Sequence, residues 1–178
     1  MTNNIVILSG SPRKDGNTDM LVTAFKDGAE SAGKNVTVFR VADMNIGGCT
    51  GCEVCSMQRG VCVQRDDMPP VLDAVKAADA LVLASPIYFF SVTAQLKLAI
   101  DRLYAIHREK DAKRCALLTC CGDEAEDTAD GAAVMFRAWM KYANWEDAGV
   151  IVAVDVHEKG EITGHKALDE AKELGRTI

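Results

Sequence analysis

The chain has 178 residues, which is enough for one domain with its own hydrophobic core. Lysine and arginine number 20 against 26 aspartates and glutamates, so the net charge is -6, and the basic residues form no run. This charge makes nucleic acid and anionic membranes poor partners, because both bind basic surfaces. The first residues show neither a secretory leader nor an apolar stretch long enough to span a membrane, so we expect a cytoplasmic protein.

Five short apolar runs predict strands, because strands buried on both faces of a parallel sheet read as continuous apolar segments. These runs are Ile5–Ser9, Val36–Val41, Ala80–Ala84, Cys115–Thr119 and Ala148–Val154. Apolar residues at helical spacing indicate four helix faces, which contain Val22, Phe25 and Ala29; Leu96, Ala99, Ile100 and Leu103; Phe136, Trp139, Met140 and Ala143; and Ala167, Leu168, Ala171 and Leu174. We expect Gly175 to cap the last helix.

Strands that alternate with helices predict a doubly wound, three-layer α/β sandwich. No repeat, low-complexity tract or linker divides the chain, so residues 1–178 are expected to form a single domain. One segment, about 44–64, fits neither pattern and holds four cysteines. Because long irregular loops are uncommon in compact domains, this loop is expected to have a function.

The loop after the first predicted strand, residues 9–18, reads SGSPRKDGNT. Loops at this place in open α/β sheets bind phosphates, yet this one is neither a Walker loop nor a G-x-G-x-x-G fingerprint. It brings Ser9, Ser11, Asn17 and Thr18 to the start of a helix, and Arg13 adds a positive charge. We therefore predict a site for a terminal phosphate. Helix capping and turn formation alone would leave the arginine and the serines without a role.

The loop after the third strand contains Pro86, Ile87, Tyr88 and Phe89, a stiff aromatic turn on which a flat heterocycle could lie. In a flavodoxin-like strand order this loop faces the first one across a shared crevice. The aromatic residues could instead pack in the core or at a subunit contact. The loop after the fourth strand would close the site through Thr119, Cys120, Cys121 and Gly122.

These motifs, with DDM at residues 66–68 and LKLAIDR at 96–102, resemble the NADPH-dependent FMN reductase superfamily. The cysteine spacing resembles that of the iron-sulfur flavoproteins within it. The resemblance implies a flavodoxin-like fold with a five-stranded parallel sheet in the order 2-1-3-4-5. It also implies FMN, with its phosphate in the 9–18 loop and its ring on the 86–89 loop. The expected cofactor-binding residues are Ser9, Ser11, Arg13, Asn17, Thr18, Pro86, Ile87, Tyr88, Phe89, Thr119, Cys120 and Gly122.

The cysteine-rich loop has the spacing C-x2-C-x2-C-x6-C, formed by Cys49, Cys52, Cys55 and Cys62. Consecutive x2 steps are typical of a [4Fe-4S] cluster, whereas structural zinc usually draws two separated C-x2-C pairs. A loop of free thiols is the third interpretation. The chain has seven cysteines and no export signal, so a disulfide framework explains them poorly. If a cluster is present, we expect it within electron-transfer reach of the flavin, because the loop leaves the same edge of the sheet.

We interpret the chain as an oxidoreductase in which FMN is the reactive group and no side chain is catalytic. It would take hydride from NADPH or NADH and pass electrons to free flavin, a quinone, or a protein or metal acceptor. His107, His157 and His165 lie outside the motif loops and are expected on the surface. One alternative is an electron carrier with FMN and [4Fe-4S], fed by ferredoxin. Another is a non-enzymatic module whose cysteine loop binds zinc or a partner.

A homodimer or homotetramer is expected. Phe89, Phe90 and Leu98 supply more apolar surface around the helix predicted at residues 93–105 than one core-facing stripe needs. In the family that the chain resembles, the flavin lies beside a subunit boundary. We therefore expect this helix and the aromatic residues before it to contribute to the contact.

Overall fold

The computed structural model describes residues 3–58, 60–106 and 113–178. Its strands are β1 (Asn4–Ser9), β2 (Asn35–Arg40), β3 (Ala80–Pro86), β4 (Arg114–Cys120) and β5 (Glu146–Ala153). Its α-helices are α1 (Asn17–Ser31), α2 (Val54–Met57), α3 (Met68–Ala77), α4 (Ala94–Arg102), α5 (Asp130–Ala143) and α6 (Lys166–Thr177). Three short 3-10 helices are η1 (Val41–Asp43), η2 (Leu103–Ile106) and η3 (Glu126–Ala129).

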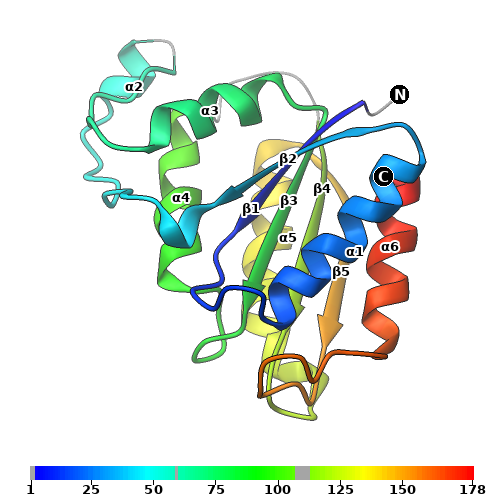
Figure 1. The fold of residues 1–178 in the computed structure, drawn as a ribbon. Coiled ribbons are helices and arrows are strands. Elements are labelled where there is room, and N and C mark those ends of the chain that lie inside the picture. The colour runs from blue at the N-terminus through cyan, green and yellow to red at the C-terminus, as the bar shows by residue number, and fades with distance from the viewer. Residues whose placement is uncertain (1–2, 59, 107–112) are drawn as a thin grey trace.

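The five strands form one sheet in the order β2-β1-β3-β4-β5, and all neighbouring strands are parallel. This confirms the predicted flavodoxin-like fold, including the strand order. The central strand β3 is buried along nearly its whole length, as expected of a strand covered on both faces. The carboxyl ends of the strands meet at one edge of the sheet, which lies at the bottom of Figure 1.

Helices cover both faces of the sheet (Figure 1). On one face α1 and α6 pack over Ile7, Val82 and Leu118, and on the other α3, α4 and α5 pack over Leu8, Leu83 and Leu117. Each face therefore has its own hydrophobic core, which holds the strand ends in fixed positions. None of the helices in the described ranges is both long enough and apolar enough to span a bilayer.

The structure corrects the prediction that Gly175 caps the last helix. Helix α6 continues to Thr177, and Gly175 lies inside it, buried against α1. A Cβ atom at this position would lie 2.0 Å from the Phe25 carbonyl oxygen, and one at Gly28 would lie 1.9 Å from the Lys172 carbonyl oxygen. The two glycines let α1 and α6 approach closely, so Gly175 serves helix packing and not helix termination.

Helix α3 lies between the second and third strands, where the sequence patterns above predicted no helix. It begins after Asp67, with proline in its first turn, a position that tolerates proline because the first amides of a helix lack intrahelical acceptors. Met68, Val71, Leu72 and Val75 are its buried residues. Their helical spacing could have identified it.

Candidate functional site

A pocket of about 380 Å³ opens among the loops at the carboxyl ends of β1, β3, β4 and β5, and we call it the strand-end pocket. Its wall brings together predicted cofactor residues from three separate loops. They are Ser11, Arg13, Asn17, Thr18, Pro86, Ile87, Tyr88, Phe89, Cys120 and Gly122. The loops meet here because parallel strands present their carboxyl ends at one edge of the sheet.

Two predicted cofactor residues do not line this pocket. Thr119 is completely buried at the end of β4, and its hydroxyl donates to the Ile151 carbonyl at 3.4 Å, so its side chain joins two strands. Ser9 is also buried, at the end of β1. Its hydroxyl oxygen has no hydrogen-bond partner among the described residues. Because buried hydroxyls normally have a partner, the Ser9 hydroxyl is available to an acceptor near the first loop.

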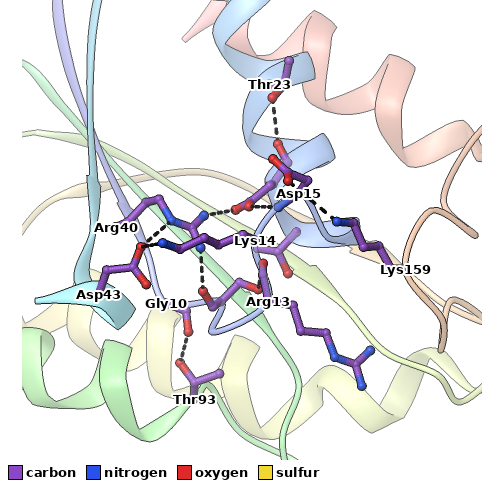
Figure 2. A network of polar contacts seen from close by, with 12 residues as sticks. Gly10, Arg13, Lys14, Asp15, Thr23, Arg40, Asp43, Thr93 and Lys159 are labelled. Atoms are coloured by element: carbon purple, nitrogen blue, oxygen red, sulfur yellow. Dashed lines mark hydrogen bonds and ion pairs between the residues drawn. The ribbon is translucent and has the colours of Figure 1, made fainter.

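A polar network fixes the loop between β1 and α1 from behind (Figure 2). Arg40, at the end of β2, donates to the Ser11 carbonyl at 3.2 Å and pairs with Asp19 at 2.5 Å and Asp43 at 3.1 Å. Although burial opposes its charge, hydrogen bonds to the two carboxylates raise the pKa of Arg40. On the other side of the loop, the Thr93 hydroxyl donates to the Gly10 carbonyl at 2.7 Å.

Arg13 and Lys14 are neighbours with different environments. Lys14 turns into the network and pairs with Asp43 at 3.5 Å. Figure 2 shows Arg13 pointing away from the network, and Arg13 is one of the residues that line the strand-end pocket. One terminal nitrogen of Arg13 donates to the His157 carbonyl at 2.9 Å. The Arg13 guanidinium is thus anchored at one corner and places a positive charge at the pocket wall.

The Asn17 side chain is engaged in hydrogen bonds to the loop after β5. Its amide nitrogen donates to the carbonyls of Val156 at 3.1 Å and Glu158 at 2.8 Å. Its amide oxygen accepts from the backbone N–H groups of Gly160 at 2.9 Å and Ile162 at 3.4 Å. Both ends of the Asn17 side chain are therefore engaged in holding the loop after β5, although the residue still borders the pocket.

The buried side of the pocket holds a thiol. Cys120 Sγ lies 3.2 Å from the Thr18 hydroxyl, and burial raises the pKa of Cys120 to about 11. Burial also raises the pKa of Cys121. Both thiols are consequently protonated near neutral pH, and they suit packing better than nucleophilic chemistry. Cys115 is buried in the core, and burial raises its pKa to about 12.

The aromatic residues after β3 form a tight turn at the rim of the pocket. Tyr88 and Ser91 exchange two backbone hydrogen bonds, of 2.9 and 3.2 Å. Phe89 and Phe90 between them have φ angles of +49° and +66°, in the left-handed region that favours glycine or asparagine. Their side chains are 97% and 62% exposed. Neither ring packs in the core of this chain, so the turn stores backbone strain without compensating burial.

The structure also shows pocket residues that sequence analysis left out. Val156 and His157 line the pocket from the loop after β5. His157 is exposed, as predicted, but it packs against Gly122, where a Cβ atom would lie 2.8 Å from the imidazole. The fifth strand also ends at this edge of the sheet, so its following loop could have been included by the same rule as the others. His165 accepts a hydrogen bond at the start of α6, and His107 lies outside the described residues.

The cysteine-rich loop forms a second cavity of about 510 Å³, which we call the cysteine cavity. Cys49, Cys52, Cys55 and Cys62 all border it, together with Arg102, Tyr104, Trp139 and Tyr142. Cys49 and Cys52 are exposed, and the other two are half-buried. The Val54 backbone amide beside Cys52 lowers the pKa of that thiol. Within the described ranges, no three His, Cys, Asp or Glu residues converge closely enough to hold a metal ion.

The cysteine cavity is separate from the strand-end pocket, and the expectation that a cluster would lie within electron-transfer reach of the flavin stays a prediction. The walls of the cysteine cavity come from the ends of α4 and α5 and from η2, and they share no lining residue with the strand-end pocket. Figure 1 shows the segment around α2 at the opposite end of α4 from the loops below the sheet. The loop does leave β2 at the expected edge, but it then runs back along α4.

Comparison with known proteins is consistent with this geometry. Residues 3–153 match the family model described as NADPH-dependent FMN reductase. An iron-sulfur flavoprotein of Archaeoglobus fulgidus is 44% identical over 94 residues, which cover 53% of this chain and 42% of that protein. The chain thus spans about half the length of the curated relatives it matches.

Solved structures share the fold over the whole chain. An NAD(P)H:quinone oxidoreductase from Methanothermobacter marburgensis superposes with a TM-score of 0.75 at 20% identity, covering 99% of this chain and 96% of that one. An FMN-dependent NADH-azoreductase from Bacillus anthracis in complex with FMN gives a TM-score of 0.72 at 18% identity, covering 98% of each chain. At these identities the likeness concerns the fold.

Proposed function

Because the chain belongs to the NADPH-dependent FMN reductase family and is thus an FMN-dependent oxidoreductase, we propose that it takes hydride from NADPH or NADH. The electrons would leave to a free flavin, a quinone, or a protein or metal acceptor. Bound FMN supplies the redox chemistry, since its ring accepts a hydride from a nicotinamide and releases the electrons to the acceptor. The protein's residues bind and orient the cofactor.

The strand-end pocket fits FMN in the chemistry of its wall. One end has the Arg13 guanidinium, the Ser11 hydroxyl and the first-turn amides of α1, whose N-cap Gly16 provides no side-chain acceptor for them. Such an end suits a phosphate, because charged donors and free helix amides both favour a dianion.

The other end of the pocket suits a flat ring. Pro86, Ile87, Tyr88 and Phe89 form an apolar wall with little conformational freedom, because proline and the tight turn restrict the backbone. Ile87 N–H already donates to the Cys120 carbonyl at 2.8 Å, which ties this wall to the end of β4. We propose that the ring rests on this wall, while Arg40 and Thr93 keep the phosphate loop in position from behind.

The single observation that carries the proposal is the meeting of these two ends in one pocket, formed by residues from separate loops. The test is an anaerobic absorbance titration of the purified, FMN-loaded protein with NADPH and, separately, with NADH. We expect at least one nicotinamide to bleach the flavin absorbance within seconds. Flavin that remains oxidised with both, yet is bleached by dithionite, would overturn the nicotinamide route.

A second candidate is an electron carrier with FMN and a [4Fe-4S] cluster, fed by ferredoxin. It is favoured by the four cysteines that border one cavity, a donor set suited to iron and sulfide. In that case Cys49, Cys52, Cys55 and Cys62 would hold the cluster as thiolates, and the cluster would supply one-electron steps. Reduced ferredoxin, added in place of the nicotinamides, tests this candidate. It predicts that ferredoxin bleaches the flavin absorbance while the nicotinamides do not, and that the anaerobically prepared protein contains iron in stoichiometric amount.

We also propose that the protein is a homodimer or homotetramer. The exposed ring of Phe89 lines the strand-end pocket, the exposed ring of Phe90 follows it, and the half-buried Leu98 on α4 adds apolar surface. Multi-angle light scattering at micromolar concentration tests the assembly, and a monomer would contradict it.

A further inference from the structure

Arg102, in the last turn of α4, is the largest completely buried side chain of the described residues. A guanidinium is rarely buried unless it is paired, because removing its charge from water is costly. Here the partner is Asp66, whose two oxygens lie 2.6 and 3.1 Å from the two terminal nitrogens of Arg102. This two-point geometry fixes the orientation of both side chains.

The same guanidinium holds both ends of the cysteine-rich loop. A terminal nitrogen of Arg102 donates to the Gly47 carbonyl at 2.8 Å, before the first cysteine, and to the Gln64 side-chain oxygen at 3.2 Å, after the last. Asp66 accepts from the Gly47 N–H at 2.9 Å, and the Gln64 amide donates to the Gly48 carbonyl at 2.9 Å. Gly48 and Gln64 are 16 residues apart in the sequence, and the Arg102 guanidinium holds these two ends of the loop together.

Arg102 also faces the cysteines, because it borders the cysteine cavity. Burial opposes its charge, but Asp66 and the neighbouring Cys62 raise the pKa of Arg102. Its Nε atom is buried and has no hydrogen-bond partner in the described part of the chain. A buried charged donor without a partner is costly, so an acceptor in or beside the cavity would relieve that cost.

We propose that Arg102 is a positioning residue for the four cysteines. It closes the loop at its base and presents a fixed positive charge to the thiols, so that the four thiols stay at the wall of one cavity, from which movement of the loop would bring them together on a thiophilic metal ion. This role goes beyond the FMN-dependent reaction and does not depend on it, because none of the contacts involves the strand-end pocket.

The test is residue-resolved alkylation of the reduced protein with iodoacetamide, followed by peptide mapping. Arg102→Lys keeps the charge but removes the fork that bridges the loop ends. We expect the half-buried Cys55 and Cys62 to react roughly tenfold faster in this variant, because opening of the loop no longer has to break the fork. Buried Cys115 should remain unreactive, which shows that the fold is retained. Arg176→Lys, in an exposed pair on α6, is the matched control and should change nothing.

A second variant and a spectroscopic measurement keep the proposal testable if Arg102→Lys unfolds the protein. Gln64→Ala removes one bridge outside α4 and should accelerate the same two cysteines by a smaller factor. Cobalt(II), added anaerobically, reports thiolate coordination through its charge-transfer absorption. We expect Arg102→Lys to bind cobalt about tenfold more weakly than the wild type. If Arg102→Lys does not fold, the same weakening is expected in Gln64→Ala. Unchanged alkylation rates and identical cobalt spectra in wild type and the folded variant would overturn the proposal.

Discussion

The strand-end pocket and the cysteine cavity are held in place in different ways. The walls of the first are loops that directly follow β1, β3, β4 and β5, so the sheet itself sets their positions. The second depends on a long loop that returns along α4 and is fastened to it by Arg102. A site at strand ends follows from the fold, whereas a site on a long loop depends on a few specific anchoring contacts.

The largest expected effect concerns the ion pair between Asp66 and Arg102, which anchors the cysteine-rich loop. Asp66→Asn leaves the buried Arg102 without a carboxylate, and removal of one partner of a buried pair typically costs about 3 kcal/mol of unfolding free energy. Urea denaturation monitored by circular dichroism measures the loss. Asp101→Asn is the matched control, because its pair with Lys97 on the same helix is exposed and should contribute less than about 1 kcal/mol.

The same pair predicts a pH dependence. The hydrogen bond from Arg102 lowers the pKa of Asp66 in the folded state, although burial opposes this effect. The stabilisation is therefore fully present above the unfolded-state pKa of about 3.9 and is lost as the pH falls through the lower folded-state value. Asp66→Asn should flatten the acid side of the stability curve. The unfolding free energies of wild type and variant are compared over the acid titration range, from about pH 5 to about pH 2. Two curves that remain parallel over this range would show that Asp66 does not link stability to pH.

The next effect is on FMN affinity at the strand-end pocket. Arg13→Ala removes a charged donor from the proposed phosphate end and should weaken binding by about 2 kcal/mol, or roughly thirtyfold, with the fold intact. Calorimetric titration of the cofactor-free protein measures the change. Lys14→Ala is the adjacent control, because Lys14 pairs with Asp43 outside the pocket and should leave the affinity nearly unchanged. Equal FMN affinities in wild type and Arg13→Ala would show that the phosphate does not bind beside Arg13.

The smallest effect concerns the turn at the rim of the pocket. Phe90→Gly relieves a left-handed backbone conformation at an exposed residue and should stabilise the isolated chain by about 1 kcal/mol. Thermal unfolding at low protein concentration measures this. Ser91→Gly, next to it and without a positive φ, should be neutral or slightly destabilising. Destabilisation by Phe90→Gly that grows with protein concentration would instead indicate that the ring is buried between copies.

The sequence was sufficient for the sheet and for most of the strand-end pocket. Buried parallel strands produce continuous apolar runs, and loops at their carboxyl ends share one edge, so the positions of Ser11, Pro86 and Gly122 followed from chain order alone. The side-chain roles were harder to predict. The Asn17 side chain binds the loop after β5, because it finds backbone partners 139 to 143 positions away, which no local pattern reveals.

The course of the cysteine-rich loop could not be predicted for a related reason. Its spacing pointed to the four cysteines, but its direction depends on the pairing of Asp66 with Arg102, which are 36 residues apart. In the sequence Arg102 looks like an ordinary charge at the end of an amphipathic helix. Gly175 was misread in the same way, since a glycine near a helix end predicts a cap, and only the packing of α6 on α1 shows the close approach.

The most direct test of the central claim combines both regions in one protein. Serine replaces Cys49, Cys52, Cys55 and Cys62 together, the variant is loaded with FMN, and NADPH or NADH is added anaerobically while the flavin absorbance is followed. We predict that FMN remains bound and is bleached as in the wild type, because the strand-end pocket alone binds the cofactor and receives the hydride. A variant that binds FMN but is no longer bleached by a nicotinamide that bleaches the wild type would contradict the account.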